Sequence, residues 1–400
     1  MRAVICGAGI AGLTQAWWLE RSGWEVTLIE IAPRLRDEGY MIDFLGPGYA
    51  TAEAMGLMPA LREAAYQAPE IRWVRPDGSV ASRIDYERFT RAQGGRLLSI
   101  MRSDLEQVLA AAVGERCEMR FGVSIDAVTL RSGGVDVRYT DGTTGEADLL
   151  IGADGIHSRI RDLVFGPEQR YLRHLGYHAA AHFLSDDELH GWLDRSFQIV
   201  RVPGRQAVCY PLRDGRLVAF YAYTSGQRAV PGDPQAAIRE IYAGMGPVID
   251  RVIAQCPPRG EVYHDLVAQI EMPAWHQQRV ALVGDACGAV SLLAGQGASM
   301  AMAAAAVLAD ELRASADVAG ALRAYEARVR PVVEATQASG RAIARWFVPS
   351  SRLTLAARDL MVRIVGHRRS DALLRAMMTT RDDGLAVAAP QTSSTILPRT

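Results

Sequence analysis

Three glycines near the N-terminus are spaced so that a backbone turn could approach a phosphate group. Gly7, Gly9 and Gly12 follow the apolar run 3–6, and a helical pattern begins directly after them. Glycine permits a tight turn at the first position, close approach of a pyrophosphate at the second, and close packing of helix on strand at the third. The helix N-terminus favours the negative charge of the phosphates. The spacing therefore predicts a dinucleotide-binding turn.

An acidic residue stands where such a unit contacts a ribose. Glu30 ends the apolar run 25–29, which is typical of the second strand in a strand–turn–helix–strand unit. Its carboxylate could accept hydrogen bonds from both ribose hydroxyls, and it would repel a 2′-phosphate. NADP is therefore disfavoured at this turn, but the unit by itself does not separate NAD from FAD.

Two later segments point to FAD through a family resemblance. Residues 152–161, GADGIHSRIR, resemble the DG motif of the group A flavoprotein monooxygenases, the aromatic hydroxylase family. Residues 284–297 resemble that family's GD motif and the glycine loop after it. With the N-terminal turn, these motifs span residues 1–335 in the family's order. The resemblance implies an FAD-dependent oxidoreductase.

The resemblance also implies roles for individual residues. Asp285 would hydrogen-bond the ribityl chain of FAD, and the loop 295–297 would run beside the isoalloxazine ring. Arg102 and Arg36 match arginines that the family places on the cofactor, while Asp154 would hold the DG segment against it. The expected cofactor-binding set is Gly7, Gly9, Ala11, Gly12, Glu30, Arg36, Arg102, Asp154, Asp285, Gly295, Gly297 and Ala298.

The glycine loop departs from the family pattern at three positions. Gly288 stands where histidine is common, Leu292 where proline is common, and Ser299 where asparagine is often found. FAD binding should survive these changes. They leave open how closely oxygen activation follows the family pattern.

In the family's chemistry, NAD(P)H reduces FAD, O₂ adds at C4a, and the flavin hydroperoxide transfers one oxygen atom to an organic substrate. The resemblance thus implies a monooxygenase that hydroxylates or epoxidises a small molecule. No residue in the sequence stands out as a catalytic base.

Aromatic and histidine side chains in the strand-rich segment 171–271 suggest a bulky, largely apolar substrate, aromatic or polyketide-like. The candidate substrate contacts are Tyr210, Phe220, Tyr221, Tyr223, His178 and His182. Strand alternation predicts that Tyr221 and Tyr223 face one side of a strand and that Phe220 faces the other.

Two other functions fit the same fold. The altered loop would suit a non-redox reaction such as a cyclisation, with FAD serving as part of the pocket wall. A flavoprotein that only binds and sequesters a ligand is the third possibility. Substrate turnover without consumption of NAD(P)H or O₂ would distinguish the first, and binding without any product would distinguish the second.

The order of the strands and helices that must position these residues predicts an α/β protein. We expect a discontinuous Rossmann-like FAD-binding domain. We expect this domain to comprise residues 1–70, 96–170 and 272–330. A strand-rich substrate domain of residues 71–95 and 171–271 is inserted in it. A helical region, 331–380, and a flexible tail, 381–400, complete the chain.

Composition excludes several other functions. The chain of 400 residues has a formal net charge of −1, so no general attraction to nucleic acid or an anionic membrane is expected. It contains no lysine, which rules out Schiff-base chemistry and a P-loop lysine. The 5 cysteines form no CxxC pair, so we expect no metal site.

The location and assembly of the protein are less constrained. The chain opens directly into an apolar strand with no charged leader, and its longest apolar stretch, 298–309, is too short to span a membrane. We therefore expect a cytoplasmic protein without membrane contact. The sequence leaves the oligomeric state open.

Overall fold

The computed structural model describes residues 1–36, 39–66, 70–366 and 385. Its central element is a six-stranded sheet in the order β17-β18-β11-β1-β2-β7. The strands are β1 (Arg2–Cys6), β2 (Glu25–Glu30), β7 (Cys117–Phe121), β11 (Leu149–Gly152), β17 (His276–Gln277) and β18 (Val280–Leu282). All neighbours pair in parallel except β17 and β18. The predicted α/β class and the assembly of this sheet from distant segments are therefore confirmed.

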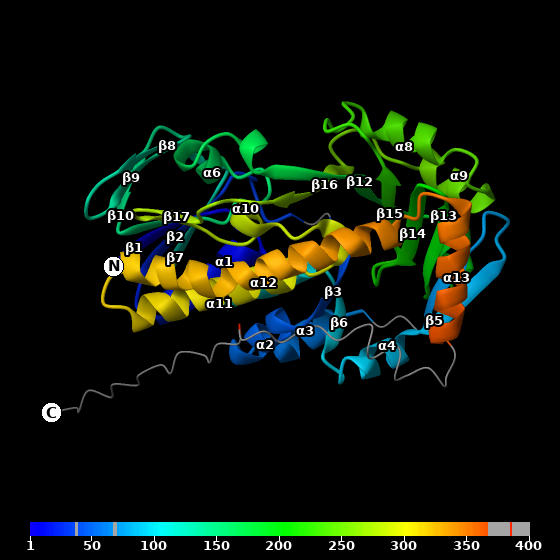
Figure 1. Ribbon diagram of the computed structural model, residues 1–400, viewed down its shortest axis with the longest axis horizontal. Helices are drawn as coiled ribbons and strands as arrows, with labels where there is room; N and C mark the ends of the chain where they lie inside the picture. The colour runs from blue at the N-terminus through cyan, green and yellow to red at the C-terminus, as the bar shows by residue number, and fades with distance from the viewer. Residues whose placement is uncertain (37–38, 67–69, 367–384, 386–400) are drawn as a thin grey trace.

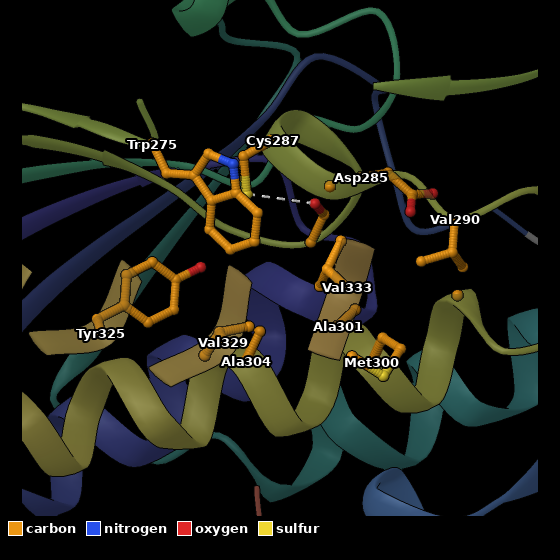
Figure 2. A pocket seen from close by; sticks show the side chains of 13 residues that line it. Trp275, Asp285, Cys287, Val290, Met300, Ala301, Ala304, Tyr325, Val329 and Val333 are labelled. Atoms are coloured by element: carbon orange, nitrogen blue, oxygen red, sulfur yellow. Dashed lines mark hydrogen bonds between the residues drawn. The ribbon is translucent and has the colours of Figure 1, made fainter. Parts of the chain in front are cut away.

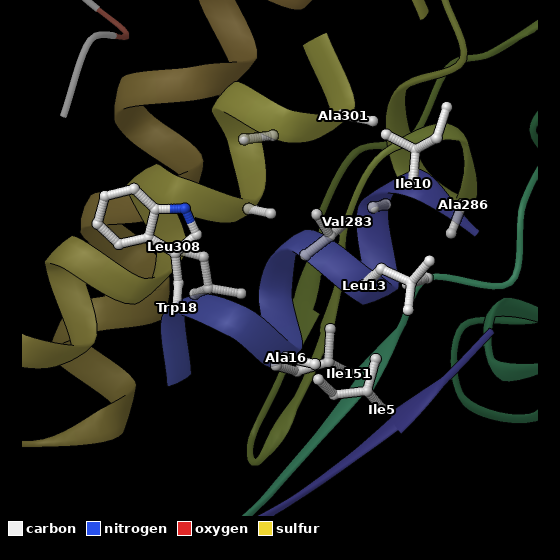
Figure 3. Packing of buried hydrophobic residues seen from close by; sticks show 14 of the residues in the cluster. Ile5, Ile10, Leu13, Ala16, Trp18, Ile151, Val283, Ala286, Ala301 and Leu308 are labelled. Carbon is white, nitrogen blue, oxygen red and sulfur yellow. The ribbon is translucent and has the colours of Figure 1, made fainter. Parts of the chain in front are cut away.

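Long helices cover this sheet (Figure 1). They are α1 (Ile10–Arg21), α5 (Arg102–Ala112), α11 (Gly297–Ala314) and α12 (Val318–Phe347). Figure 3 shows Trp18 of α1 beside Leu308 of α11, while Leu13 of α1 lies on the side of the strand residue Ile5, and all four side chains are nearly or fully buried. Burying one such aliphatic side chain stabilises the fold by about 1.5–3 kcal/mol. This apolar packing fixes the glycine turn and the N-terminus of α11 in one rigid frame.

Shorter elements surround the frame. A three-stranded sheet consists of β8 (Ile125–Leu130), β9 (Val135–Tyr139) and β10 (Thr144–Ala147). The motif segments form α6 (Arg159–Val164), η1 (Glu168–Arg170), α10 (Asp285–Gly288) and η2 (Leu292–Ala294). A two-stranded sheet of β3 (Met41–Leu45) and β6 (Leu97–Met101) lies with α2 (Pro47–Ala54) and α3 (Met58–Ala64). These elements connect the frame to a second large sheet.

The second sheet has seven strands in the order β16-β12-β15-β14-β13-β4-β5. They are β4 (Glu70–Val74), β5 (Val80–Asp85), β12 (Leu172–Leu184), β13 (Phe197–Val202), β14 (Arg205–Pro211), β15 (Leu217–Thr224) and β16 (Tyr263–Ile270). The associated helices are α4 (Tyr86–Ala92), α7 (Asp187–Leu193), α8 (Pro234–Tyr242) and α9 (Pro247–Ala254). Most of the sheet thus comes from the segment between the DG and GD motifs.

The helix α12 runs without interruption through Pro331, at the residue where the sequence predicts a separate C-terminal region to begin. A proline inside a helix removes one backbone hydrogen bond, and here the helix tolerates that loss. α13 (Arg352–Gly366) follows and packs along β5. The predicted tail, 381–400, lies outside the described residues except for Leu385. In the described part of the chain, none of the helices combines the length and apolarity needed to cross a membrane.

Candidate functional site

The glycine turn has the backbone that its spacing predicts. Gly7 has φ +104°, and a Cβ there would lie 2.6 Å from the carbonyl oxygen of Ala153. A Cβ on Gly12 would lie 1.8 Å from the carbonyl oxygen of Gly7. At Gly9 the nearest atom to such a Cβ is Oε1 of Glu106, 3.6 Å away. Two glycines are therefore required by packing, while the third leaves open space at the N-terminus of α1, where a pyrophosphate would fit.

Glu30 lies beside this turn at the end of β2. Its carboxylate accepts hydrogen bonds from the backbone N–H groups of Ala8 and Ala32, both at 2.9 Å. These bonds hold the side chain at the carboxyl end of β2, next to the glycine turn. The position suits an acceptor for ribose hydroxyls.

Arg102 begins α5, and its guanidinium borders the space beside Gly9. Nη2 of Arg102 lies 3.1 Å from Oε1 of Glu106. Burial raises the pKa of the Glu106 carboxyl, and the positive charges of Arg102 and Arg36 oppose that rise. Both predicted arginines therefore act on one carboxyl group near the turn, although the Arg36 side chain itself is exposed.

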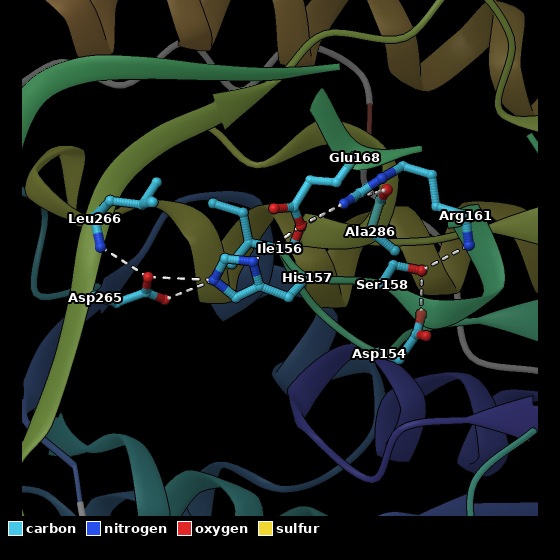
Figure 4. A network of polar contacts seen from close by, with 9 residues as sticks. All are labelled: Asp154, Ile156, His157, Ser158, Arg161, Glu168, Asp265, Leu266 and Ala286. Carbon is cyan, nitrogen blue, oxygen red and sulfur yellow. Dashed lines mark hydrogen bonds and ion pairs between the residues drawn. The ribbon is translucent and has the colours of Figure 1, made fainter. Parts of the chain in front are cut away.

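The DG motif is held by a polar network (Figure 4). Asp154 accepts hydrogen bonds from Ser158 Oγ at 2.5 Å and from the backbone N–H of Ile160 at 3.0 Å. The carboxylate thereby stabilises the start of α6. Its bonds thus lie within its own motif, where they fix the loop that follows β11.

The buried Arg161 joins the two later motifs (Figure 4). It donates to the carbonyl oxygen of Ala286 in the GD motif at 3.0 Å and to that of Ile156 at 2.7 Å. It also forms an ion pair with Glu168 at 3.1 Å. One guanidinium therefore sets the distance between the DG and GD segments.

His157 connects the DG segment to the seven-stranded sheet. Its Nδ1 lies 2.9 Å from Glu168 and its Nε2 lies 3.2 Å from Asp265 of β16. The hydrogen bond with Asp265 raises the pKa of His157 to about 9, and the contact with Glu168 adds to the rise. The two sheets are thus linked by an imidazolium between two carboxylates.

The GD motif brings Asp285 to the first turn of α11. A Cβ on Gly297 would lie 3.8 Å from Oδ1 of Asp285, and the Asp285 side chain is exposed. Gly295 has φ +67°, which favours glycine, and Ala298 follows in the first turn of α11. The first N–H groups of a helix have no partner within it, so this end of α11 can stabilise negative charge.

Packing explains why Gly288 replaces the family's common histidine. A Cβ at Gly288 would lie 2.9 Å from Cγ1 of Val333 and 3.4 Å from Cζ2 of Trp275. Figure 2 shows the indole of Trp275 beside Cys287 of α10, with the ring of Tyr325 next to the indole. Tyr325 donates to the carbonyl oxygen of Leu282 at 3.1 Å. A histidine would collide with this apolar wall.

A cavity of about 880 Å³ lies between the N-terminus of α11, α12, the β3–β6 pair and the seven-stranded sheet. Its lining includes the aromatic residues Tyr40, Trp73, Phe89, Tyr210, Phe220 and Phe347. Gly295, Gln296 and Ser299 also line it, so the glycine loop and the cavity are continuous. Such a volume accommodates a drug-sized ligand.

Two of the six predicted substrate contacts, Tyr210 and Phe220, line this cavity, but the other four do not. Tyr221 packs against Tyr242 of α8 with ring centroids 4.7 Å apart. Tyr221 also bonds His182 at 2.9 Å, and Tyr223 bonds His178 at 3.2 Å. The alternation along β15 was predicted correctly, but these four side chains occupy the face that α8 and α9 cover.

The sequence did not indicate two charged groups on the cavity wall. Asp43 of β3 accepts hydrogen bonds at Oδ1 from Tyr86 Oη at 2.7 Å and from Ser99 Oγ at 2.6 Å. Arg358 of α13 also lines the cavity. Asp43 could have been identified from the sequence, because an acidic residue inside the apolar stretch 41–45 is unusual. Arg358 gives no such signal, because 44 basic residues are spread along the chain.

The described part of the chain has no group of three or more His, Cys, Asp and Glu residues placed to hold a metal ion. The glycine turn, Glu30, Arg102 and the α11 N-terminus instead form a continuous set that fits an elongated dinucleotide. Together with the parallel sheet, they indicate a dinucleotide-binding protein.

Comparison with known proteins agrees with this class. The family model described as an FAD binding domain matches residues 1–339, and the chain belongs to this family. An uncharacterised protein of Mycobacterium tuberculosis (strain CDC 1551 / Oshkosh) is 34% identical over 322 residues, covering 78% of this chain and 85% of the relative. A flavin-dependent monooxygenase from an unknown prokaryotic organism is 27% identical over 362 residues, covering 88% and 92%.

Among solved structures, tetracycline destructase Tet(55) superimposes with a TM-score of 0.79 at 25% identity, covering 92% of this chain and 96% of that chain. With the family match, these relatives establish a group A FAD-dependent monooxygenase, which is an oxidoreductase.

Proposed function

We propose that this flavoprotein uses NAD(P)H and O₂ to hydroxylate or epoxidise a bulky, largely apolar small molecule, aromatic or polyketide-like. The observation that carries the proposal is the cavity of about 880 Å³, which is rich in aromatic side chains and continuous with the glycine loop. A pocket of that size admits a molecule of several fused rings. The relative Tet(55), named a tetracycline destructase, supports a substrate of this kind.

FAD would be held along the groove that the motifs form. Its pyrophosphate would lie at Gly9 and Ala11 on the N-terminus of α1, and Glu30 would accept the ribose hydroxyls. Arg102, with Arg36, would offset phosphate charge. Beyond them, Asp285 and the α11 N-terminus at Gly295, Gly297 and Ala298 would contact the ribityl chain and the ring.

When bound, FAD supplies hydride acceptance and oxygen activation. The protein's own part is to position the substrate and exclude water. Phe220 and Tyr210 form part of the cavity wall, and Tyr210 Oη is fixed because it accepts the N–H of Met41 at 2.7 Å. The helix dipole of α11 stabilises negative charge near the glycine loop. Asp154 fixes the DG loop through its bond from Ser158, and Arg161 joins the DG segment to the GD segment through Ala286.

Anaerobic reduction tests the proposal. The purified holoenzyme is mixed with NADH or NADPH in the presence and absence of polycyclic and phenolic compounds, and flavin absorbance is followed. We expect bleaching of the flavin that one compound accelerates. When O₂ is then admitted, we expect oxygen uptake and a product heavier by one oxygen atom. A Phe220→Ala variant, whose substitution lies on the cavity wall, should weaken the acceleration, while Tyr221→Phe on the opposite face should retain it.

Other outcomes point to the rival functions. Conversion of a compound without NAD(P)H or O₂ consumption would replace the proposal with a non-redox enzyme such as a cyclase. Tight binding with no product under any reducing condition would replace it with a ligand-sequestering flavoprotein.

A further inference from the structure

A buried arginine lies on the cavity wall at the end beneath α13. Arg358 is only 5% exposed, yet it is one of the residues that line the cavity. Its Nη1 donates to the carbonyl oxygen of Phe347 at 2.7 Å and to Oε1 of Gln206 at 3.2 Å. These two bonds fix the guanidinium plane against the end of α12.

In the part of the chain that the structure describes, the other edge of this guanidinium has no hydrogen-bond partner. Nε of Arg358 is enclosed and without a hydrogen bond, and among the described residues none bonds to Nη2. Nε and Nη2 together form a planar fork of parallel N–H donors, which is the geometry that binds a carboxylate through two bonds. Buried donors without a partner are costly, and a ligand acceptor would offset that cost.

The local charge balance also favours an anion. The neighbouring carboxylate of Asp359 is already paired with Arg201, a second buried arginine whose Nη1 has no hydrogen-bond partner. Two guanidiniums therefore face one carboxylate. Burial, together with the charge of Arg201, lowers the pKa of Arg358 to about 10, so its guanidinium remains protonated at neutral pH.

The surroundings indicate what else the ligand must carry. Trp73 borders the same end of the cavity and packs with Ile84, Ile199 and Val362 in an apolar cluster. A free inorganic anion would leave these apolar surfaces uncovered. A rigid ring system with one acidic substituent would cover them and reach the arginine.

We propose that Arg358 anchors an anionic oxygen of the substrate, a carboxylate or an ionised phenol or enol, at the end of the cavity beneath α13. The proposal rests on the proposed monooxygenase function and narrows its substrate class to acidic polycyclic compounds. It makes Arg358 a specificity-determining residue contributed by α13.

Matched pairs of neutral and acidic probes test this assignment. Binding of anthracene-2-carboxylate and anthracene-2-carboxamide to the FAD holoenzyme is measured by calorimetry. A second pair, 7-hydroxycoumarin and 7-methoxycoumarin, distinguishes a phenolate, because the absorbance of the hydroxycoumarin reports its ionisation. The variants are Arg358→Gln, Arg358→Lys and the control Arg352→Gln, which removes the same charge from an exposed position of α13.

We expect wild type and Arg352→Gln to bind at least one acidic probe about tenfold or more tightly than its neutral partner, roughly the effect of one charge-assisted bond. Arg358→Gln should abolish this preference while leaving the affinity for the neutral probe within about threefold, and Arg358→Lys should restore part of it. If wild type shows no acidic preference in either pair, or if Arg358→Gln retains the preference, the assignment is wrong.

The wild-type comparison decides the matter even if Arg358→Gln does not fold. FAD content and flavin reduction by NAD(P)H are recorded for the same samples. A reducible flavin without acidic preference would refute the role of Arg358 alone, whereas a flavin that no reductant bleaches would refute the proposed function.

Discussion

Ser99 donates a hydrogen bond from Oγ to Oδ1 of Asp43 at 2.6 Å, across the β3–β6 pair in which the two residues stand opposite each other. Tyr86 Oη donates to the same oxygen at 2.7 Å. Burial raises the pKa of Tyr86 well above its ordinary value, and the nearby charge of Asp43 adds to the rise, so the phenol remains a donor. This cluster is a polar point on a largely apolar cavity wall.

The Asp43–Ser99 bond should show a measurable coupling. Because hydrogen bonds to a charged group contribute about 1.5–3 kcal/mol, a double-mutant cycle with Asp43→Ala and Ser99→Ala should give a coupling of about 1–3 kcal/mol in urea unfolding. The exposed pair Asp214 and Arg216 serves as the control and should couple by less than about 1 kcal/mol. Additive effects at Asp43 and Ser99 would show that the bond does not stabilise the fold.

Alanine substitutions at Gly12 and Gly9 should impair FAD binding in two different ways. Gly12→Ala places a Cβ 1.8 Å from a backbone oxygen, so the turn should not form and the purified protein should lack FAD. Gly9→Ala meets no atom closer than 3.6 Å, so the apoprotein should unfold within about 0.5 kcal/mol of wild type. Its affinity for FAD should nevertheless fall about tenfold or more, because the methyl group occupies the space for the pyrophosphate.

Gly133→Ala is the control for both, since nothing lies within 4 Å of its Cβ position. Thermal unfolding and flavin fluorescence titration measure the two effects. Normal FAD affinity in Gly9→Ala would place the pyrophosphate elsewhere.

Restoring the family's histidine at Gly288 should destabilise this protein. Gly288→His drives an imidazole into Trp275 and Val333, and overpacking of this kind costs about 1–3 kcal/mol. Gly288→Ala adds only the Cβ and should cost less. Urea unfolding of the holoenzyme measures the free energy of unfolding of wild type, Gly288→Ala and Gly288→His, which should fall in that order. A Gly288→His variant as stable as wild type would mean that the apolar wall around α10 yields easily.

The linkage through His157 predicts a pH dependence of stability. In the folded protein the pKa of His157 is raised to about 9, first by the hydrogen bond with Asp265, whereas an unfolded histidine titrates near about 6.5. Its contribution is therefore fully present below about pH 6.5 and is lost as the pH rises through about 9. The denaturation midpoint should fall over this window, and His157→Gln should reduce the fall.

His157 is half exposed, so salt should weaken its contribution. Repeating the series at high ionic strength supplies the control. A His157→Gln variant that retains the full wild-type pH dependence would assign the effect to other groups.

The sequence predicted those parts of the site that depend on local backbone. Gly12 packs against Gly7, five positions away, and Gly7 itself has φ +104°, so the glycine spacing indicates the turn. The close contact of Gly7 with Ala153 of the DG motif comes from a distant segment, and the spacing does not reveal it. The correct alternation along β15 did not reveal which face borders the cavity, because α8 and α9 bury Tyr221 as thoroughly as the cavity wall buries Phe220.

The polar points of the cavity were missed for a different reason. Asp43, Tyr86 and Ser99 lie far apart in the chain and meet only through the pairing of β3 with β6 and the start of α4. Arg358 acquires its character from burial on α13, and nothing in its sequence neighbourhood distinguishes it from other arginines of this lysine-free chain.

The uninterrupted helix α12 connects the GD motif at one end of the molecule to Arg358 of α13 at the other. Tyr325 near its start bonds the strand that leads into the GD motif, and Phe347 at its end receives the bond from Arg358. With a rise of about 1.5 Å per residue, the 30 residues extend roughly 45 Å. Deleting one residue beyond Pro331 would turn everything after it by about 100° and displace the substrate end relative to the flavin end. The number of residues in α12 therefore fixes the distance and the rotation between the flavin end and the substrate end. Insertions and deletions in this helix should be unfavourable even where its side chains face solvent.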